Sequence, residues 1–171
     1  MSVLLPFETL RVLPRRLPSS RSRAAWVAVA VLGLAVGVAY SNSLHGPFVF
    51  DDELAIVQNP DIREFASALR ENPQIDTATA VGRPLLRVTL WANYAVGGLA
   101  VEGYHAFNVA LHGLVAGVLF ALSRRLLEIP PLAPRYGALA SPLALGIVLL
   151  WALHPLQTES VTYVVQRAEM L

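Results

Sequence analysis

The feature that most constrains this chain is an uncharged apolar segment, Ala24–Tyr40, that follows an arginine-rich start. With Ser41–Leu44 as an interfacial end, the segment reaches the ~20 residues that an α-helix needs to cross a ~30 Å hydrocarbon core. Trp26 and Tyr40 stand near its two ends, where aromatic side chains favour the membrane interface. The sequence therefore predicts a transmembrane helix over residues 24–44.

The overall composition also indicates a membrane protein. Of the 171 residues, 55% are hydrophobic and only 15% are charged, whereas soluble domains carry about 25% charged residues. The absence of cysteine excludes disulfides and thiolate metal sites, and a formal net charge of +1 gives no indication of nucleic-acid binding. A cleaved signal peptide ending at Gly37-Val38-Ala39 is the alternative to a first span, although the basic region before it is long for that role.

Two more apolar segments follow, over residues 104–123 and 137–153, joined by the short connection 124–136. Residues 154–171 predict one further amphipathic helix, which ends inside its apolar pattern, so we expect a truncated chain. The predicted fold is an all-α membrane protein with about three transmembrane helices, a partial fold of its class.

The distribution of charge predicts the orientation. Eight of the 13 arginines lie in residues 1–23 and 124–136, and ten of the 12 acidic residues lie elsewhere. Because basic residues accumulate on the cytoplasmic side, we expect a cytoplasmic basic tail at 1–23. The same rule places the loop 45–103 and the segment 154–171 on the periplasmic, extracellular or luminal face of a multi-pass protein.

The loop at 45–103 is too long for a simple turn and should contain helices. Asn59-Pro60 predicts the start of a short amphipathic helix and Asn72-Pro73 its end. A second helix should run from Pro84 to Gly97-Gly98. One face of that helix carries arginine and aromatic side chains, which predicts a position along the membrane interface. They are Arg83, Arg87, Trp91 and Tyr94.

A polar stripe marks the second span, where His105, Asn108 and His112 share one face. Polar side chains in a span usually face the bundle interior, so we expect interhelical hydrogen bonds. A transport or proton-relay role is the alternative. Positions seven apart lie ~10.5 Å apart along a helix, so this stripe is a poor metal site.

Three adjacent carboxylates, Asp51, Asp52 and Glu53, follow the first span. Repulsion should raise the pKa of one of them, which suits a general base acting on a hydroxyl. Arginines bind phosphate in a bidentate manner, so the combination predicts transfer from a lipid-linked phosphate donor. An ordinary acidic loop with snorkelling arginines is the alternative. The candidate residues on this face are Asp51, Asp52, Glu53, Arg83, Arg87, His105, His154, Glu159 and Arg167.

Seven short blocks, in this order, resemble one family of enzymes. They are Phe48-Val-Phe-Asp-Asp-Glu53, Ile56-Val-Gln-Asn-Pro-Asp-Ile-Arg63, Gly82-Arg-Pro-Leu85, Asn93-Tyr-Ala-Val-Gly-Gly98, Gly103-Tyr-His-Ala-Phe-Asn-Val-Ala-Leu-His112, His154-Pro-Leu-Gln-Thr-Glu-Ser-Val161 and Gln166-Arg-Ala-Glu169. The chain, from about residue 24 onward, resembles the N-terminal part of the transmembrane and tetratricopeptide-repeat O-mannosyltransferases and their bacterial relatives. These are GT-C class membrane glycosyltransferases.

The resemblance implies transfer of a sugar, usually mannose, from a polyprenyl-phosphate carrier to a protein hydroxyl, with inversion at the anomeric carbon. It implies Asp51 as the base, with Asp52 as the alternative or as an acceptor-orienting partner; relatives more often have Asp-Glu at this pair. Arg83 and Arg167 become candidates for the donor phosphate. Glu53, His154 and Glu159 would shape the same pocket.

No cofactor is implied beyond the lipid-linked sugar, and the resemblance leaves any metal requirement open. The implied partners are membrane lipid, the polyprenyl-phosphate sugar and a protein acceptor, with no nucleic acid. Family members have more spans than three, and often a C-terminal repeat domain, so we expect a fragment that needs its missing part. A non-catalytic membrane component is the remaining alternative.

Overall fold

The computed structural model describes residues 20–70 and 80–171, and every regular element within them is helical. The longer helices are α1 (Ser20–Ala39), α3 (Pro84–Gly97), α4 (Val101–Leu127) and α6 (Ala140–Ala152). Shorter helical turns are η1 (Ser41–His45), η2 (Glu53–Val57), η3 (Asp61–Arg63), α2 (Phe65–Ala68), α5 (Ala133–Tyr136), η4 (Gly137–Leu139), α7 (Gln157–Thr162) and η5 (Val165–Glu169). The all-α class is confirmed for these residues. Most of the tail predicted at 1–23, and the stop expected at Asn72-Pro73, lie outside them.

Two helical segments are long and apolar enough to cross a membrane: α4, and the stretch Ala133–Ala152 that ends with α6. The apolar part of α1, Arg23–Ala39, is shorter. The helix stops at Ala39 and the tighter turn η1 follows, so it does not continue to residue 44 as expected. The described residues therefore contain two candidate spans where the sequence predicted three.

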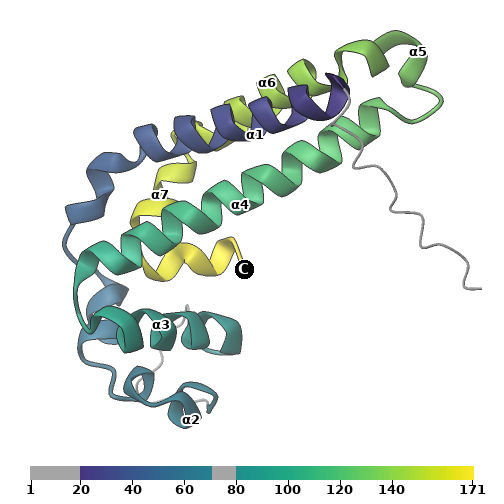
Figure 1. Ribbon diagram of the computed structural model, residues 1–171. Helices are drawn as coiled ribbons and strands as arrows, with labels where there is room; N and C mark the ends of the chain where they lie inside the picture. The colour runs from purple at the N-terminus through teal and green to yellow at the C-terminus, as the bar shows by residue number, and fades with distance from the viewer. Residues whose placement is uncertain (1–19, 71–79) are drawn as a thin grey trace, which may run out of the picture.

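Helices α1, α4 and α6 pack side by side as one bundle (Figure 1). Small side chains such as Ala116 on α4 and Ala144 on α6 are fully buried at the contacts, which allows helices to approach closely. The face of α1 that packs inward carries Leu32 and Val36. Gly33 and Gly37, on another side of α1, are exposed.

A second cluster of buried side chains lies beside one end of the bundle (Figure 1). It gathers residues 46–70, 80–100 and 163–171, which we call the lobe. Helix α3 begins at Pro84 and ends at Gly97, as the sequence predicts. Gly98 has φ of 59°, a left-handed conformation that glycine adopts without strain and that ends the helix.

Two of the expected helices are broken. The helix after Pro60 is interrupted at Glu64, whose backbone is extended, and continues as the short α2. The helix over 157–171 is interrupted at Tyr163, between α7 and η5. The predicted apolar positions Val161, Val164 and Val165 are nevertheless buried, because both halves still pack inward.

The side chain of Arg87 packs inside the protein and does not lie on an exposed face of α3. The residue is buried, and its Nε donates a hydrogen bond to the carbonyl of Ala68 at 3.0 Å. Trp91 packs against Phe65 with ring centroids 4.8 Å apart. Arg87 and Trp91, two of the four residues predicted to form an interfacial face, therefore pack on α2.

Candidate functional site

The acidic turn begins with an unusual backbone conformation at Phe50. Phe50 has φ of 50°, and its side chain is 85% exposed. A left-handed conformation is costly for a residue with a bulky side chain, and such strain gathers at functional sites. The turn is fixed on its other side, where the amide of Asp51 donates to the phenol oxygen of Tyr163 at 2.9 Å.

Asp52 is fully buried and accepts hydrogen bonds from backbone amides. Its Oδ1 accepts from Val165 at 2.8 Å, and its Oδ2 lies 3.4 Å from the amide of Val164. Oδ2 also lies 3.3 Å from the amide of Val49. Burial raises the pKa of Asp52 above its ordinary value, and these amides act in the opposite direction. Its carboxylate therefore stabilises the backbone where the helix is interrupted, just before η5.

Asp51 and Glu53 are both less buried than Asp52. Asp51 is half-buried and Glu53 is exposed. The Oε1 of Glu53 lies 3.4 Å from the side-chain amide of Gln58. Of the three clustered carboxylates, Asp52 supports the backbone, Asp51 is half-buried and Glu53 is exposed.

Arg167 occupies the interior of the lobe. Its Nε donates to the carbonyl of Val164 at 3.2 Å, and its Nη2 donates to that of Tyr104 at 3.3 Å. Its Nη1 donates to Oδ1 of Asn93 at 2.6 Å. The guanidinium carbon lies 4.6 Å from the centre of the Phe107 ring. A donor phosphate would have to displace these contacts to reach Arg167.

Burial lowers the pKa of the Arg167 guanidinium to about 9, while Tyr104 and the nearby Asp52 act in the opposite direction. The side chain is therefore still cationic at neutral pH. Asp52 and Arg167 bind opposite sides of the same peptide segment, because Asp52 accepts from the amide of Val164 and Arg167 donates to its carbonyl. Together they fix the position of η5.

Arg83, the other predicted phosphate ligand, lies at the surface immediately before α3. Its Nη1 lies 3.2 Å from Oε1 of Glu169, and the two side chains are 43% and 57% exposed. A pair this exposed contributes little to stability. The guanidinium of Arg83 is therefore accessible to a ligand that competes with Glu169.

His154 and Glu159 are both exposed, at the two sides of the turn into α7. The Nδ1 of His154 accepts the amide of Leu156 at 3.2 Å, which caps that turn. Glu159, Asp51 and Asp52 all act on the pKa of Tyr163, which burial and these negative charges raise.

The polar stripe on α4 binds backbone carbonyls of other elements, as the sequence predicts. His105 Nε2 lies 2.9 Å from the carbonyl oxygen of Gly46, and His112 Nε2 lies 3.0 Å from that of Ala152. The side-chain amide of Asn108 donates to the carbonyls of Val161 at 3.1 Å and Val164 at 3.3 Å. Each of the three bonds a different segment, which indicates a structural role.

Two residues of the site were not assigned a role from the sequence. Tyr163 accepts from the amide of Asp51, and Asn93 holds Arg167. Asn93 opens one of the seven family-like blocks, so its place there was the available signal. For Tyr163 the only signal was its position opposite the apolar face of the predicted last helix. Among the described residues, no group of three or more His, Asp or Glu side chains could hold a metal ion.

The fold and this site define a class: a helical membrane protein with a carboxylate cluster at one end of its helix bundle. Comparisons with known proteins define the family. Protein O-mannosyl-transferase Tmtc1 of Drosophila melanogaster is 36% identical over 78% of this chain. TMTC4 of Homo sapiens and TMTC1 of Mus musculus, both also named protein O-mannosyl-transferases, are 33% and 34% identical over 91% of it. The predicted resemblance to the transmembrane and tetratricopeptide-repeat O-mannosyltransferases is confirmed.

The chain spans less than a quarter of the length of these relatives: 15% of the fly protein, 22% of the human protein and 17% of the mouse protein. The relatives' names therefore describe much longer proteins. No family model matches the chain, and no solved structure matches it.

Proposed function

We propose that this chain forms the base-bearing part of a membrane glycosyltransferase that moves a sugar, mannose by analogy with its relatives, onto a protein hydroxyl. The relatives' printed names support the reaction class. The single observation that carries the proposal is the difference in burial between the two residues of the acidic pair. Asp52 is fully buried on backbone amides, whereas its neighbour Asp51 is only half-buried.

Asp51 is the general base in this proposal. A base must reach the proton that it removes, so geometry is considered before pKa. The carboxylate of Asp52 is fully buried and occupied by amides of Val164 and Val165. Asp51 follows the strained, exposed Phe50 and is held through its amide by Tyr163. Asp51, which keeps part of its surface exposed, is therefore the better placed of the two for an acceptor hydroxyl.

The reaction is a single displacement. Asp51 removes the proton of the acceptor hydroxyl as its oxygen bonds the anomeric carbon, and the bond from that carbon to the polyprenyl phosphate breaks. The configuration of the anomeric carbon inverts. The phosphate leaves with the electron pair of that bond, and a guanidinium stabilises its charge.

Arg83 is the better placed of the two arginines for that phosphate. Its guanidinium is exposed and pairs only with the exposed carboxylate of Glu169 among the contacts observed. Arg167, whose nitrogens bind Asn93, Tyr104 and Val164, acts in this proposal as a positioning residue for η5. Glu53, His154 and Glu159 line the surrounding surface.

The orientation follows from the arginine distribution, and it is part of the proposal that the lobe faces away from the cytoplasm. This agrees with the fold in one respect. The lobe lies beside the C-terminal ends of α1 and α6 and the N-terminal end of α4 (Figure 1). The C-terminal end of α4, which carries Arg124 and Arg125, lies at the opposite end of the bundle.

The test compares Arg83→Gln with Glu169→Gln in the protein as its cell makes it, with mannosyl transfer from a polyprenyl-phosphate donor as the readout. Arg83→Gln should raise the KM for the donor. Glu169→Gln should lower it or leave it unchanged, because it removes the competing carboxylate. Equal donor KM values in both variants and the wild type would exclude Arg83 as the phosphate ligand.

A further inference from the structure

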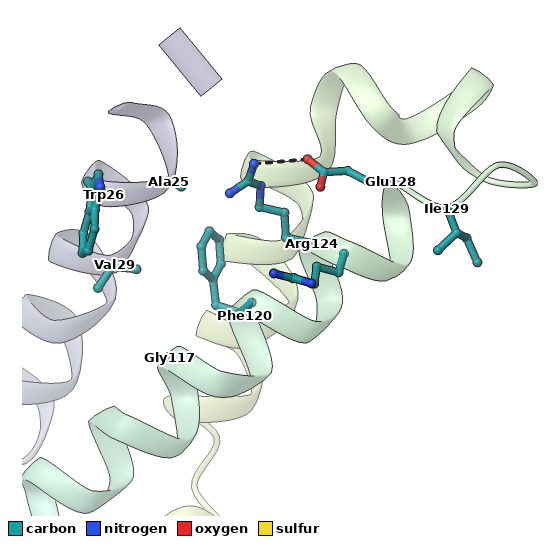
Figure 2. A pocket seen from close by; sticks show the side chains of 10 residues that line it. Ala25, Trp26, Val29, Gly117, Phe120, Arg124, Glu128 and Ile129 are labelled. Carbon is teal, nitrogen blue, oxygen red and sulfur yellow. Dashed lines mark ion pairs between the residues drawn. The ribbon is translucent and has the colours of Figure 1, made fainter. Parts of the chain in front are cut away.

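A cavity of about 750 Å³ opens between α1 and α4 at the end of the bundle far from the acidic turn (Figure 2). At 1.5 Å per residue, Arg124 lies ~30 Å along α4 from Tyr104, which contacts the lobe. The volume is within the range of ~300–1,000 Å³ that is usual for ligand pockets. The proposed glycosyltransferase reaction makes no use of this cavity.

The cavity joins an apolar wall to a charged rim. The wall comes from α1 and α4, where Trp26, Val29 and Phe120 line it. Trp26 is 70% exposed although it is large and apolar. The rim consists of Arg124, Arg125 and Glu128 at the end of α4 and just after it.

The arginines of the rim are not fully paired, so the rim can bind an anion. Arg124 Nη2 lies 3.2 Å from Oε1 of Glu128 (Figure 2). Its Nε is buried and has no hydrogen-bond partner among the described residues. Arg125 is exposed beside it. Among the residues that the structure describes, two arginines face one carboxylate in the rim, which leaves one positive charge there without a counterion.

We propose that this cavity is a binding site for an anionic phospholipid. The headgroup phosphate lies against Arg124 and Arg125, and an acyl chain lies along Trp26, Val29 and Phe120. Guanidinium groups match the geometry of phosphate oxygens. Tryptophan and arginine at the same level mark a membrane interface, and basic pockets between helices on the cytoplasmic side bind anionic headgroups.

Charge favours a lipid over the other occupants of an apolar groove. A packed helix would bury Arg125 as well and would need a carboxylate of its own to satisfy the two arginines, because an unpaired buried charge is costly. A second copy of this chain across a two-fold axis would bring the same arginines against each other. A lipid phosphate supplies the missing negative charge and its acyl chain covers the apolar wall.

The first test is native mass spectrometry of the whole chain in a non-ionic detergent. Phosphatidylglycerol and phosphatidylcholine with identical acyl chains compete at equal concentration. The wild type should bind phosphatidylglycerol preferentially. Arg125→Gln should reduce that preference about fivefold, the effect of one interfacial arginine. Glu128→Gln should increase it, because it releases Arg124. Arg135→Gln, an exposed arginine outside the lining, is the matched control and should change nothing.

The second test fills the apolar wall. Gly117 lines the cavity, and a Cβ there would meet no atom within 4 Å, so Gly117→Leu can be accommodated without a clash at that atom. Gly113 on the same helix is equally open but outside the lining, so Gly113→Leu is its control. Gly117→Leu should lower binding of both lipids several-fold, and Gly113→Leu should not.

Three results would overturn the proposal. The first is equal binding of the two lipids by the wild type. The second is the same loss of preference in Arg125→Gln and Arg135→Gln. The third is unchanged lipid binding in Gly117→Leu, which would show that another occupant fills the groove or that none does.

Discussion

Asn108→Leu should detach the segment that carries η5 from α4. The break at Tyr163 leaves helix-end carbonyls that no further turn of helix can satisfy. The side-chain amide of Asn108 donates to two of them, on Val161 at 3.1 Å and on Val164 at 3.3 Å. Leucine has nearly the same shape and donates no hydrogen bond, so both of these donations are lost.

The magnitude follows from the groups left behind. Each buried polar group without a partner costs ~1–3 kcal/mol, although Arg167 still donates to the carbonyl of Val164. We therefore expect a loss of about 3 kcal/mol in the local free energy of opening, on the order of a 100-fold increase in the opening constant.

Hydrogen–deuterium exchange measured by mass spectrometry reads this constant directly. Peptides covering residues 161–167 should exchange about 100-fold faster, and peptides from α6 should not change. The matched control is Asn42→Leu, at an exposed asparagine in η1. Unchanged exchange in Asn108→Leu, or an equal change in the control, would refute the structural role assigned to Asn108.

Two further predictions concern the acidic turn. The folded state binds the proton of buried Asp52 more tightly than the unfolded chain does, because its pKa is raised from 3.8. The stability of the η5 contact should therefore fall as pH rises from 3.8 through the raised pKa, and Asp52→Asn should flatten this dependence in exchange measurements. Tyr163→Phe removes the acceptor of the Asp51 amide but keeps its ring contact with Phe50. The amide of Asp51 should then exchange several-fold faster, which exchange at single-residue resolution can check, and unchanged exchange would contradict the hydrogen bond.

The helical class and the position of the acidic turn could be predicted because they depend on local patterns. Apolar runs, prolines and paired glycines placed the ends of α3 correctly. Interruptions of helices were not predicted. The break at Tyr163 is stabilised by Asn108 and Asp52, which bind backbone groups on its two sides. Such long-range pairing leaves no periodic signal in the sequence.

The roles within the site could be predicted only in part. Sequence reasoning placed Asp51 and Asp52 together but could not distinguish a surface carboxylate from one buried on the amides of Val164 and Val165, more than 100 residues away. Arg167 was expected to face a phosphate because arginine binds phosphate in a bidentate manner and because the family resemblance implied it. It is buried because Asn93 and the carbonyl of Tyr104 accept its hydrogen bonds.

The most direct test of the account is mannosyl transfer by the protein as its cell makes it, with Asp51→Asn compared with the wild type. Removal of a general base typically lowers the rate 10²–10⁴-fold. The account predicts a loss of that order with unchanged expression and unchanged exchange of the Val164 and Val165 amides, which Asp52 holds. Transfer at the wild-type rate in Asp51→Asn would contradict the assignment of Asp51 as the base.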